Sequence, residues 1–135
     1  MIRIQKEWYR VDKVREDKDT LYVFGDNLCQ KGKGGQAIIR DLPNAFGIPT
    51  KRMPSMHEQA FFSDRPEEHS AVIDAISALY VLSIYRDVVF PKDGIGTGLA
   101  QMDTKSPKIY KEMLCMFEEY FNIVMGNDGL EIKDK

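Results

Sequence analysis

Apolar residues along the chain gather alternately into short β-prone runs and into stripes with helical spacing. The β-prone runs predict strands over 2–8, 20–24, 46–50, 87–90 and 121–125. The helical stripes predict helices over 34–42, 66–85 and 107–120. The residues expected to face the sheet are Ala37, Ile38 and Leu42 in the first helix, Val72, Ile73, Ile76, Leu79 and Tyr80 in the second, and Ile109, Met113, Phe117 and Tyr120 in the third.

The type of each run indicates where it lies. Ile2 and Ile4 alternate with polar residues, which is typical of an edge or half-buried strand. The run 20–24 is continuously β-prone, as expected for a buried central strand. Charged residues over 12–19 predict a solvated turn, and the absence of a period over 51–65 predicts a long ordered loop.

Strands that alternate with helices predict an α/β fold, with a largely parallel sheet covered on both faces and a single domain over 1–135. In such sheets ligands bind beyond the carboxyl ends of the strands. Several glycines and polar residues follow these strand ends directly. We therefore expect the binding site at that edge of the sheet.

Two glycine-rich loops follow predicted strands and lead toward helices. One contains Gly94, Gly96 and Gly98, and the other extends over 25–35. Glycine lets backbone N–H groups converge on an anion, because no Cβ blocks close approach. Two such loops at one sheet edge could hold a ligand with two phosphates. The ordinary alternative is that each loop is only a tight strand-to-helix connection.

Two familiar nucleotide motifs are excluded. The loop G-I-G-T-G fails the G-x-G-x-x-G pattern of dinucleotide-binding folds, because Leu99 stands where the third glycine is required. The segment G-K-G-G-Q-A fails the P-loop pattern, because no Ser or Thr follows its lysine to hold magnesium.

Composition narrows the class of protein further. A hydrophobic fraction of 43%, a charged fraction of 30% and no long apolar run indicate a soluble protein that needs no membrane. No secretory signal precedes the first strand, so we expect a cytoplasmic location. A net charge of −2 with interspersed signs argues against nonspecific duplex binding. With only His57 and His69 and no Cys/His cluster, neither a metal site nor a cofactor is expected.

The two glycine loops resemble those of macro domains, which bind ADP-ribose. The segment V-V-F-P-K followed by G-I-G-T-G-L and a helix is similar to the second phosphate loop and last helix of that family. The segment V-F-G-D-N-L-C-Q-K-G-K-G-G-Q-A is similar to its first loop. The similarity extends roughly over 21–120. T-K-R at Thr50–Arg52 resembles the subclass that includes terminal ADP-ribose protein glycohydrolase.

The resemblance implies a three-layer α/β/α sandwich with a mixed, largely parallel sheet that binds ADP-ribose or a related NAD-derived nucleotide. Backbone amides of Gly96, Thr97 and Gly98 would bind the diphosphate from one side, and Asp26 and Asn27 would hold the distal ribose. Asp12 is a loose candidate for reading adenine. The full set of ligand-binding residues that it implies is Gly25, Asp26, Asn27, Gly32, Gly34, Gly35, Gln36, Thr50, Arg52, Gly94, Ile95, Gly96, Thr97, Gly98 and Leu99.

The same resemblance implies a lysine nucleophile, which matches Lys51. Its amine would need a pKa lowered by partial burial or by a neighbouring cation such as Arg52. The family's assisting Asp is absent, because Ala100 occupies that position, so catalysis would need Asp93 or Asp103 to reach the same point.

Three functions stay open. One is a metal-independent hydrolase that removes ADP-ribose from a macromolecule or a metabolite, and the second is a non-catalytic reader or sponge of such a nucleotide. The third is a structural or regulatory domain whose crevice is vestigial.

Several of these residues also have ordinary structural explanations. Lys51 and Arg52 could be a solvated pair after a strand, and Asp26 with Asn27 could form a turn. His57 fits a surface histidine better than a ligand contact. Phe61 and its neighbour Phe62 are expected to anchor the 51–65 loop to the core rather than to stack on a base.

Overall fold

A computed structural model describes residues 1–133. Its main sheet has the strand order β1-β4-β2-β3. The four strands are β1 (Ile2–Gln5), β2 (Leu21–Asn27), β3 (Ala45–Lys51) and β4 (Val88–Pro91). All neighbouring strands in this sheet run parallel. The expected α/β class is therefore confirmed, as are the edge position of β1 and the central position of β2.

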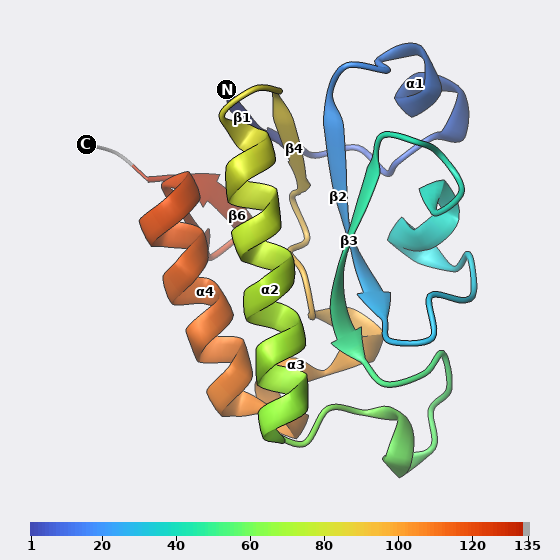
Figure 1. The fold of residues 1–135 in the computed structure, drawn as a ribbon, viewed down its shortest axis with the longest axis vertical. Helices are drawn as coiled ribbons and strands as arrows, with labels where there is room; N and C mark the ends of the chain where they lie inside the picture. The colour runs from blue at the N-terminus through green and yellow to red at the C-terminus, as the bar shows by residue number, and fades with distance from the viewer. Residues whose placement is uncertain (134–135) are drawn as a thin grey trace.

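Helices α2 (Pro66–Ser83) and α4 (Pro107–Phe121) cover one face of this sheet (Figure 1). Val23 and Phe90 from the sheet pack there with Ile76 and Phe117 from the helices, in one buried cluster. Strand residues of β2 and β4 alternate between the two faces, as the pleat requires. This alternation directs Tyr22, Phe24 and Val89 to a second cluster on the opposite face.

The opposite face is covered by shorter elements, α1 (Val11–Glu16) and a 3₁₀ helix (Gly35–Ile39) (Figure 1). The prediction of a solvated turn over 12–19 was wrong over its first half, where α1 buries Val14. The predicted helix over 34–42 is a 3₁₀ helix that buries Ile39 and leaves Ile38 43% exposed. A 3₁₀ helix has three residues per turn instead of the 3.6 of an α-helix. The residue that faces the sheet is therefore Ile39 and not the predicted Ile38.

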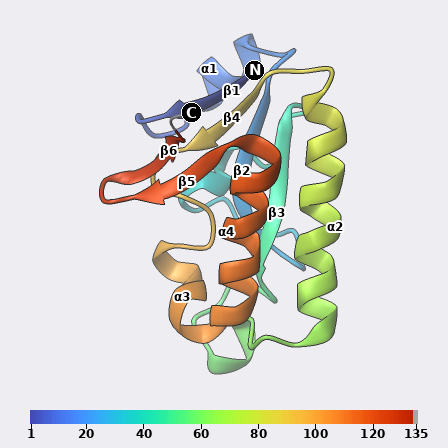
Figure 2. The ribbon, with the colours of Figure 1, turned by 90° about the vertical axis from the view of Figure 1, so that its left-hand side faces the viewer.

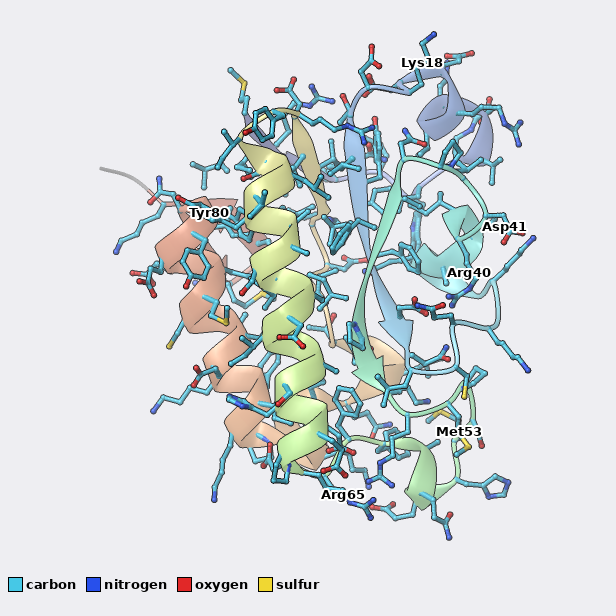
Figure 3. The ribbon with its side chains drawn as sticks, in the orientation of Figure 1. Lys18, Arg40, Asp41, Met53, Arg65 and Tyr80 are labelled. Carbon is cyan, nitrogen blue, oxygen red and sulfur yellow. The ribbon has the colours of Figure 1, made fainter. Side chains whose placement is uncertain are left out.

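Both long helices begin where the sequence predicts, at Pro66 and Pro107. Proline suits the first position of a helix because the N–H that it lacks would have no partner within the helix. Tyr80 of α2 and Tyr120 of α4 were expected to face the sheet, and this was wrong. The two rings contact each other instead, 4.9 Å apart, and both are partly exposed. Figure 3 shows Tyr80 on the side of α2 toward α4.

Residues 123–132 form a hairpin outside the main sheet. The prediction of a last strand over 121–125 was partly right: β5 (Ile123–Gly126) forms, but Phe121 still belongs to α4. Strand β5 pairs antiparallel with β6 (Gly129–Ile132) (Figure 2). The Leu130 N–H donates to the Lys92 carbonyl at 2.8 Å, which ties the hairpin to the end of β4. Within residues 1–133, no helix is both long and apolar enough to cross a membrane.

Candidate functional site

The carboxyl ends of β2, β3 and β4 lie at one edge of the sheet (Figure 1). The residues at these strand ends and in the loops that follow them line a cleft of about 710 Å³. Both glycine loops line it, and so does the residue that ends β3, Lys51. The sequence-predicted residues that line the cleft are Gly25, Asp26, Asn27, Gly32, Gly34, Gly35, Gln36, Thr50, Lys51, Asp93, Gly94, Gly96, Thr97, Gly98 and Leu99. The expectation that these strand ends and loops meet at one edge of the sheet is therefore confirmed, whereas their role in binding stays a prediction.

The second glycine loop presents a run of free backbone donors. The N–H groups of the four residues 96–99 donate to no acceptor within residues 1–133. Among the bonds that hold the loop in shape, Met102 N–H donates to the Gly96 carbonyl, and the Thr97 hydroxyl donates to the Asp93 carbonyl. Because these bonds leave the N–H groups of residues 96–99 unused, the groups are available to an anion.

The first glycine loop offers a matching run. The N–H groups of residues 32–36 likewise have no acceptor in the described part of the chain. A Cβ added at Gly34 or Gly35 would meet nothing within 4 Å, so these two glycines border open space. The two runs face the same cleft from different strands, β2 and β4.

Asp26 and Asn27 at the end of β2 line the cleft, and their side chains also have local partners. Asp26 forms an ion pair with Arg40 at 2.6 Å and accepts a hydrogen bond from the Asn27 N–H at 2.7 Å. The Asn27 side-chain amide donates to the Lys31 carbonyl at 2.8 Å, which closes the turn after β2. The turn explanation is therefore right about local geometry, and it does not remove either residue from the cleft.

Lys51 is a buried cation at the wall of the cleft. Its side chain is only 9% exposed, and its Nζ donates to the Ser55 carbonyl and lies 4.7 Å from the centre of the Phe61 ring. Burial removes water from the ammonium group and lowers the pKa of Lys51 below its usual value. Within residues 1–133 it forms no ion pair with a carboxylate. The solvated-pair explanation was therefore wrong for Lys51.

Arg52 does not line the cleft, which corrects its assignment as a ligand-binding residue. Its guanidinium bonds Glu68 at 2.6 Å, Gln59 at 2.8 Å and Ser63 at 2.8 Å. Glu68 is 1% exposed, so this ion pair fastens the 51–65 loop to the start of α2. Since the Arg52 charge is neutralised there, the lowered pKa of Lys51 comes from its burial and not from Arg52.

Three other residues that the sequence predicted for the site do not lie where the prediction requires. Ile95 is 1% exposed and packs in the core, and Asp103 lies on the short helix α3 (Met102–Lys105), outside the lining of the cleft. Asp93 does line it, but it follows β4 whereas Lys51 ends β3, with β2 between them. Within residues 1–133, neither carboxylate forms an ion pair with the Lys51 amine.

The sequence analysis missed several residues that line the cleft. Trp8 lies just after β1 with 73% of its side chain exposed, and Met56 is 52% exposed. Arg40 and Lys31 add positive charge. A tryptophan among charged residues in K-E-W-Y-R was the available signal for Trp8, since a large aromatic side chain exposed in a charged segment often marks a contact surface.

Two remaining expectations concern residues near the site. Asp12 is ion-paired with Arg10 and lies outside the lining, so it is not an adenine contact of this cleft. His57 is exposed and also lies outside the lining, as the surface explanation predicted. Phe61 and Phe62 are buried, which confirms that they anchor the loop.

Residues 4–116 match a family of unknown function, DUF7831. The chain belongs to this family. No curated protein and no solved structure matches the chain significantly. Any function for this DUF7831 protein must therefore be argued from the cleft itself.

Proposed function

We propose that this protein binds a nucleotide with two linked phosphates, of the ADP-ribose type. The observation that carries the proposal is the pair of amide runs, residues 32–36 and 96–99, whose N–H groups have no acceptor within residues 1–133 and whose residues, Lys33 apart, line one cleft. Backbone N–H groups that converge from two sides suit phosphate oxygens, which accept several hydrogen bonds each. A cleft of about 710 Å³ has the volume of a typical small-molecule site.

The charges around the cleft support an anionic ligand. Lys31, Arg40 and Lys51 are set against Asp26 and Asp93, and the Asp26 charge is already matched by Arg40. Lys51 is a buried cation without a carboxylate partner in the described chain, so a bound anion would relieve its unfavourable burial. No metal is required to neutralise the phosphates in this arrangement.

The residues at the two ends of the cleft indicate which end of the ligand each would bind. Trp8 and Asp93 also line a small hollow together with Gln36. We place the base at that end, where the exposed indole of Trp8 offers a stacking surface. The distal sugar then extends past the glycine loops toward Lys51 and the 51–56 segment. The macro-domain resemblance agrees with this order along the sheet edge, and the helices on both sheet faces are compatible with a macro-type sandwich.

Hydrolysis of an ADP-ribosyl linkage is the second candidate function, and the environment of Lys51 favours it. A desolvated lysine has a larger fraction of the neutral amine that attacks carbon. In the proposed step the Nζ–C1 bond forms while the bond from C1 to the leaving atom breaks, and a proton from Nζ passes to the leaving atom. Water then adds to C1 while the Nζ–C1 bond breaks, a proton from the water passes to Nζ, and ADP-ribose is released.

Ala100 supports the alternative of a non-catalytic reader. It is 8% exposed and lines the cleft, where a catalytic carboxylate would be expected from the resemblance. Without that carboxylate the activation of water lacks a nearby base. Binding is therefore the conclusion, and turnover is decided by experiment. A cytoplasmic location stays part of the proposal, because two exposed free cysteines suit a reducing compartment.

Titration calorimetry with ADP-ribose, NAD and AMP tests the binding function. We expect heat of binding and a raised melting temperature with ADP-ribose, because a ligand of the folded state must stabilise it. Neither signal at millimolar concentration of all three ligands would overturn the proposal.

Release of ADP-ribose from modified protein, followed by mass spectrometry, tests hydrolysis. Lys51→Arg is the matched control, since it keeps the positive charge but loses the nucleophilic amine. Turnover by the natural protein that Lys51→Arg abolishes would establish the hydrolase, and binding without any turnover would establish the reader.

A further inference from the structure

The side-chain amide of Gln36 bridges the two sides of the cleft. Its Oε1 accepts a hydrogen bond from the Gly25 N–H at 2.9 Å, and its Nε2 donates to the Gly94 carbonyl at 2.9 Å. Gly25 belongs to β2, and Gly94 opens the second glycine loop after β4. Gln36 itself directly follows Gly34 and Gly35 of the first loop. One side chain thus connects the first loop, the end of β2 and the second loop.

These two bonds use the Gln36 amide in a way that few other side chains can reproduce. Bridging a backbone N–H and a backbone carbonyl requires an acceptor and a donor on the same planar group. Glutamate would still accept from Gly25, but its second oxygen would face the Gly94 carbonyl and repel it. Methionine has a similar volume and would make neither bond. Because both ends of the Gln36 amide already have protein partners, we do not count this side chain among the groups that contact a bound phosphate.

We propose that Gln36 is a positioning residue that sets the gap between the two amide runs, and that this gap selects ligands with two linked phosphates over ligands with one. The inference rests on the proposed function and adds the residue responsible for its phosphate selectivity. A diphosphate must reach both runs at once, so its affinity depends on their separation. A single phosphate can bind to one run and does not depend on the gap.

The experiment compares affinities for ADP-ribose, ADP and AMP by titration calorimetry in one buffer. The variants are Gln36→Met and Gln36→Glu, and the control is Gln59→Met, an exposed glutamine whose side chain forms no hydrogen bond within residues 1–133. We expect both Gln36 variants to lose about tenfold in affinity for ADP-ribose and ADP, because the bridge that fixes the gap between the two amide runs is broken at the Gly94 carbonyl in each, and to keep AMP affinity within about twofold. The control should match the natural protein for all three ligands.

The ratio of ADP to AMP affinity separates positioning from general support of the fold. An equal loss for ADP and AMP, or no loss for either, would overturn the inference while leaving the proposed function intact. Absence of binding of any ligand by the natural protein would overturn both. Circular dichroism and thermal melting report whether the variants fold, and unfolding of both would also count against the inference, because Gln36 would then serve the fold rather than selectivity.

Discussion

Arg40 and Asp26 form an ion pair at the wall of the cleft, with 2.6 Å between Nη1 and Oδ1 and about one-tenth of each side chain exposed. The same guanidinium donates to the Gly32 carbonyl at 2.7 Å and to the Lys31 carbonyl at 3.1 Å, and it lies over the Phe24 ring. Figure 3 shows Arg40 beside the 3₁₀ helix that follows the first glycine loop. Arg40 therefore holds that loop in place while it neutralises a carboxylate at the wall of the proposed anion-binding cleft.

Replacing Arg40 by Met should destabilise the protein strongly. The change leaves the Asp26 carboxylate nearly buried without its partner, and breaking such a pair costs about 3 kcal/mol or more in unfolding free energy. The double variant Arg40→Met with Asp26→Asn should recover part of that loss, because no unpaired charge remains. Urea denaturation of the two single variants and the double variant measures the coupling. Losses that simply add would show that the pair contributes nothing as a pair.

Gly96 and Gly98 should respond differently to Ala. Both have positive φ, 81° and 56°, so each substitution has a backbone cost of about 1 kcal/mol. A Cβ at Gly96 would also lie 2.2 Å from the sulfur of the fully buried Met102, whereas a Cβ at Gly98 would meet nothing within 4 Å. We expect Gly96→Ala to lower the unfolding free energy by about 3 kcal/mol and Gly98→Ala by about 1 kcal/mol. Thermal or urea denaturation checks this order, and equal losses would contradict it.

The sheet and the position of the cleft could be predicted because strong signals produced them. The run that became β2 is buried on both faces, so it is apolar without interruption. The glycines after β2 and β4 had to lie together once the strands were parallel neighbours. The parallel topology was therefore enough to predict that two loops far apart in the sequence lie side by side.

The misplaced features have weaker or longer-range causes. The six residues of α1 bury only Val14, too few for a helical stripe. The β5–β6 hairpin depends on its contact with the end of β4, which no local pattern reports. The sequence could also have indicated that Lys51 and Arg52 do not share one environment, because successive side chains of an extended chain point in opposite directions. Trp8 joins the cleft only through the pairing of β1 with β4.

Trp8→Ala should weaken nucleotide binding with little effect on stability. A base stacked on an aromatic side chain contributes about 1–3 kcal/mol, so we expect affinity for ADP-ribose to fall about tenfold or more. The side chain is 73% exposed, and its removal should therefore leave the melting temperature nearly unchanged. Tyr85→Ala is a matched control, because Tyr85 is 81% exposed and lies outside the cleft. Unchanged affinity in Trp8→Ala would place the base elsewhere.

The burial of Lys51 should appear as a pH dependence of stability. Its pKa is lowered in the folded protein, so above the folded pKa and below about 10.4 the unfolded chain binds more protons than the folded one. The unfolding free energy of the natural protein should therefore rise with pH across that window, relative to Lys51→Met. Below the folded pKa both states hold the proton, and the difference between the two proteins should be constant. Tyrosines whose pKa is raised by burial, such as Tyr22 and Tyr110, are common to both proteins and cancel in the comparison. Urea denaturation from pH 7 to pH 10.5 measures the difference, and a difference that stays flat over this range would show that Lys51 is solvated like an ordinary surface lysine.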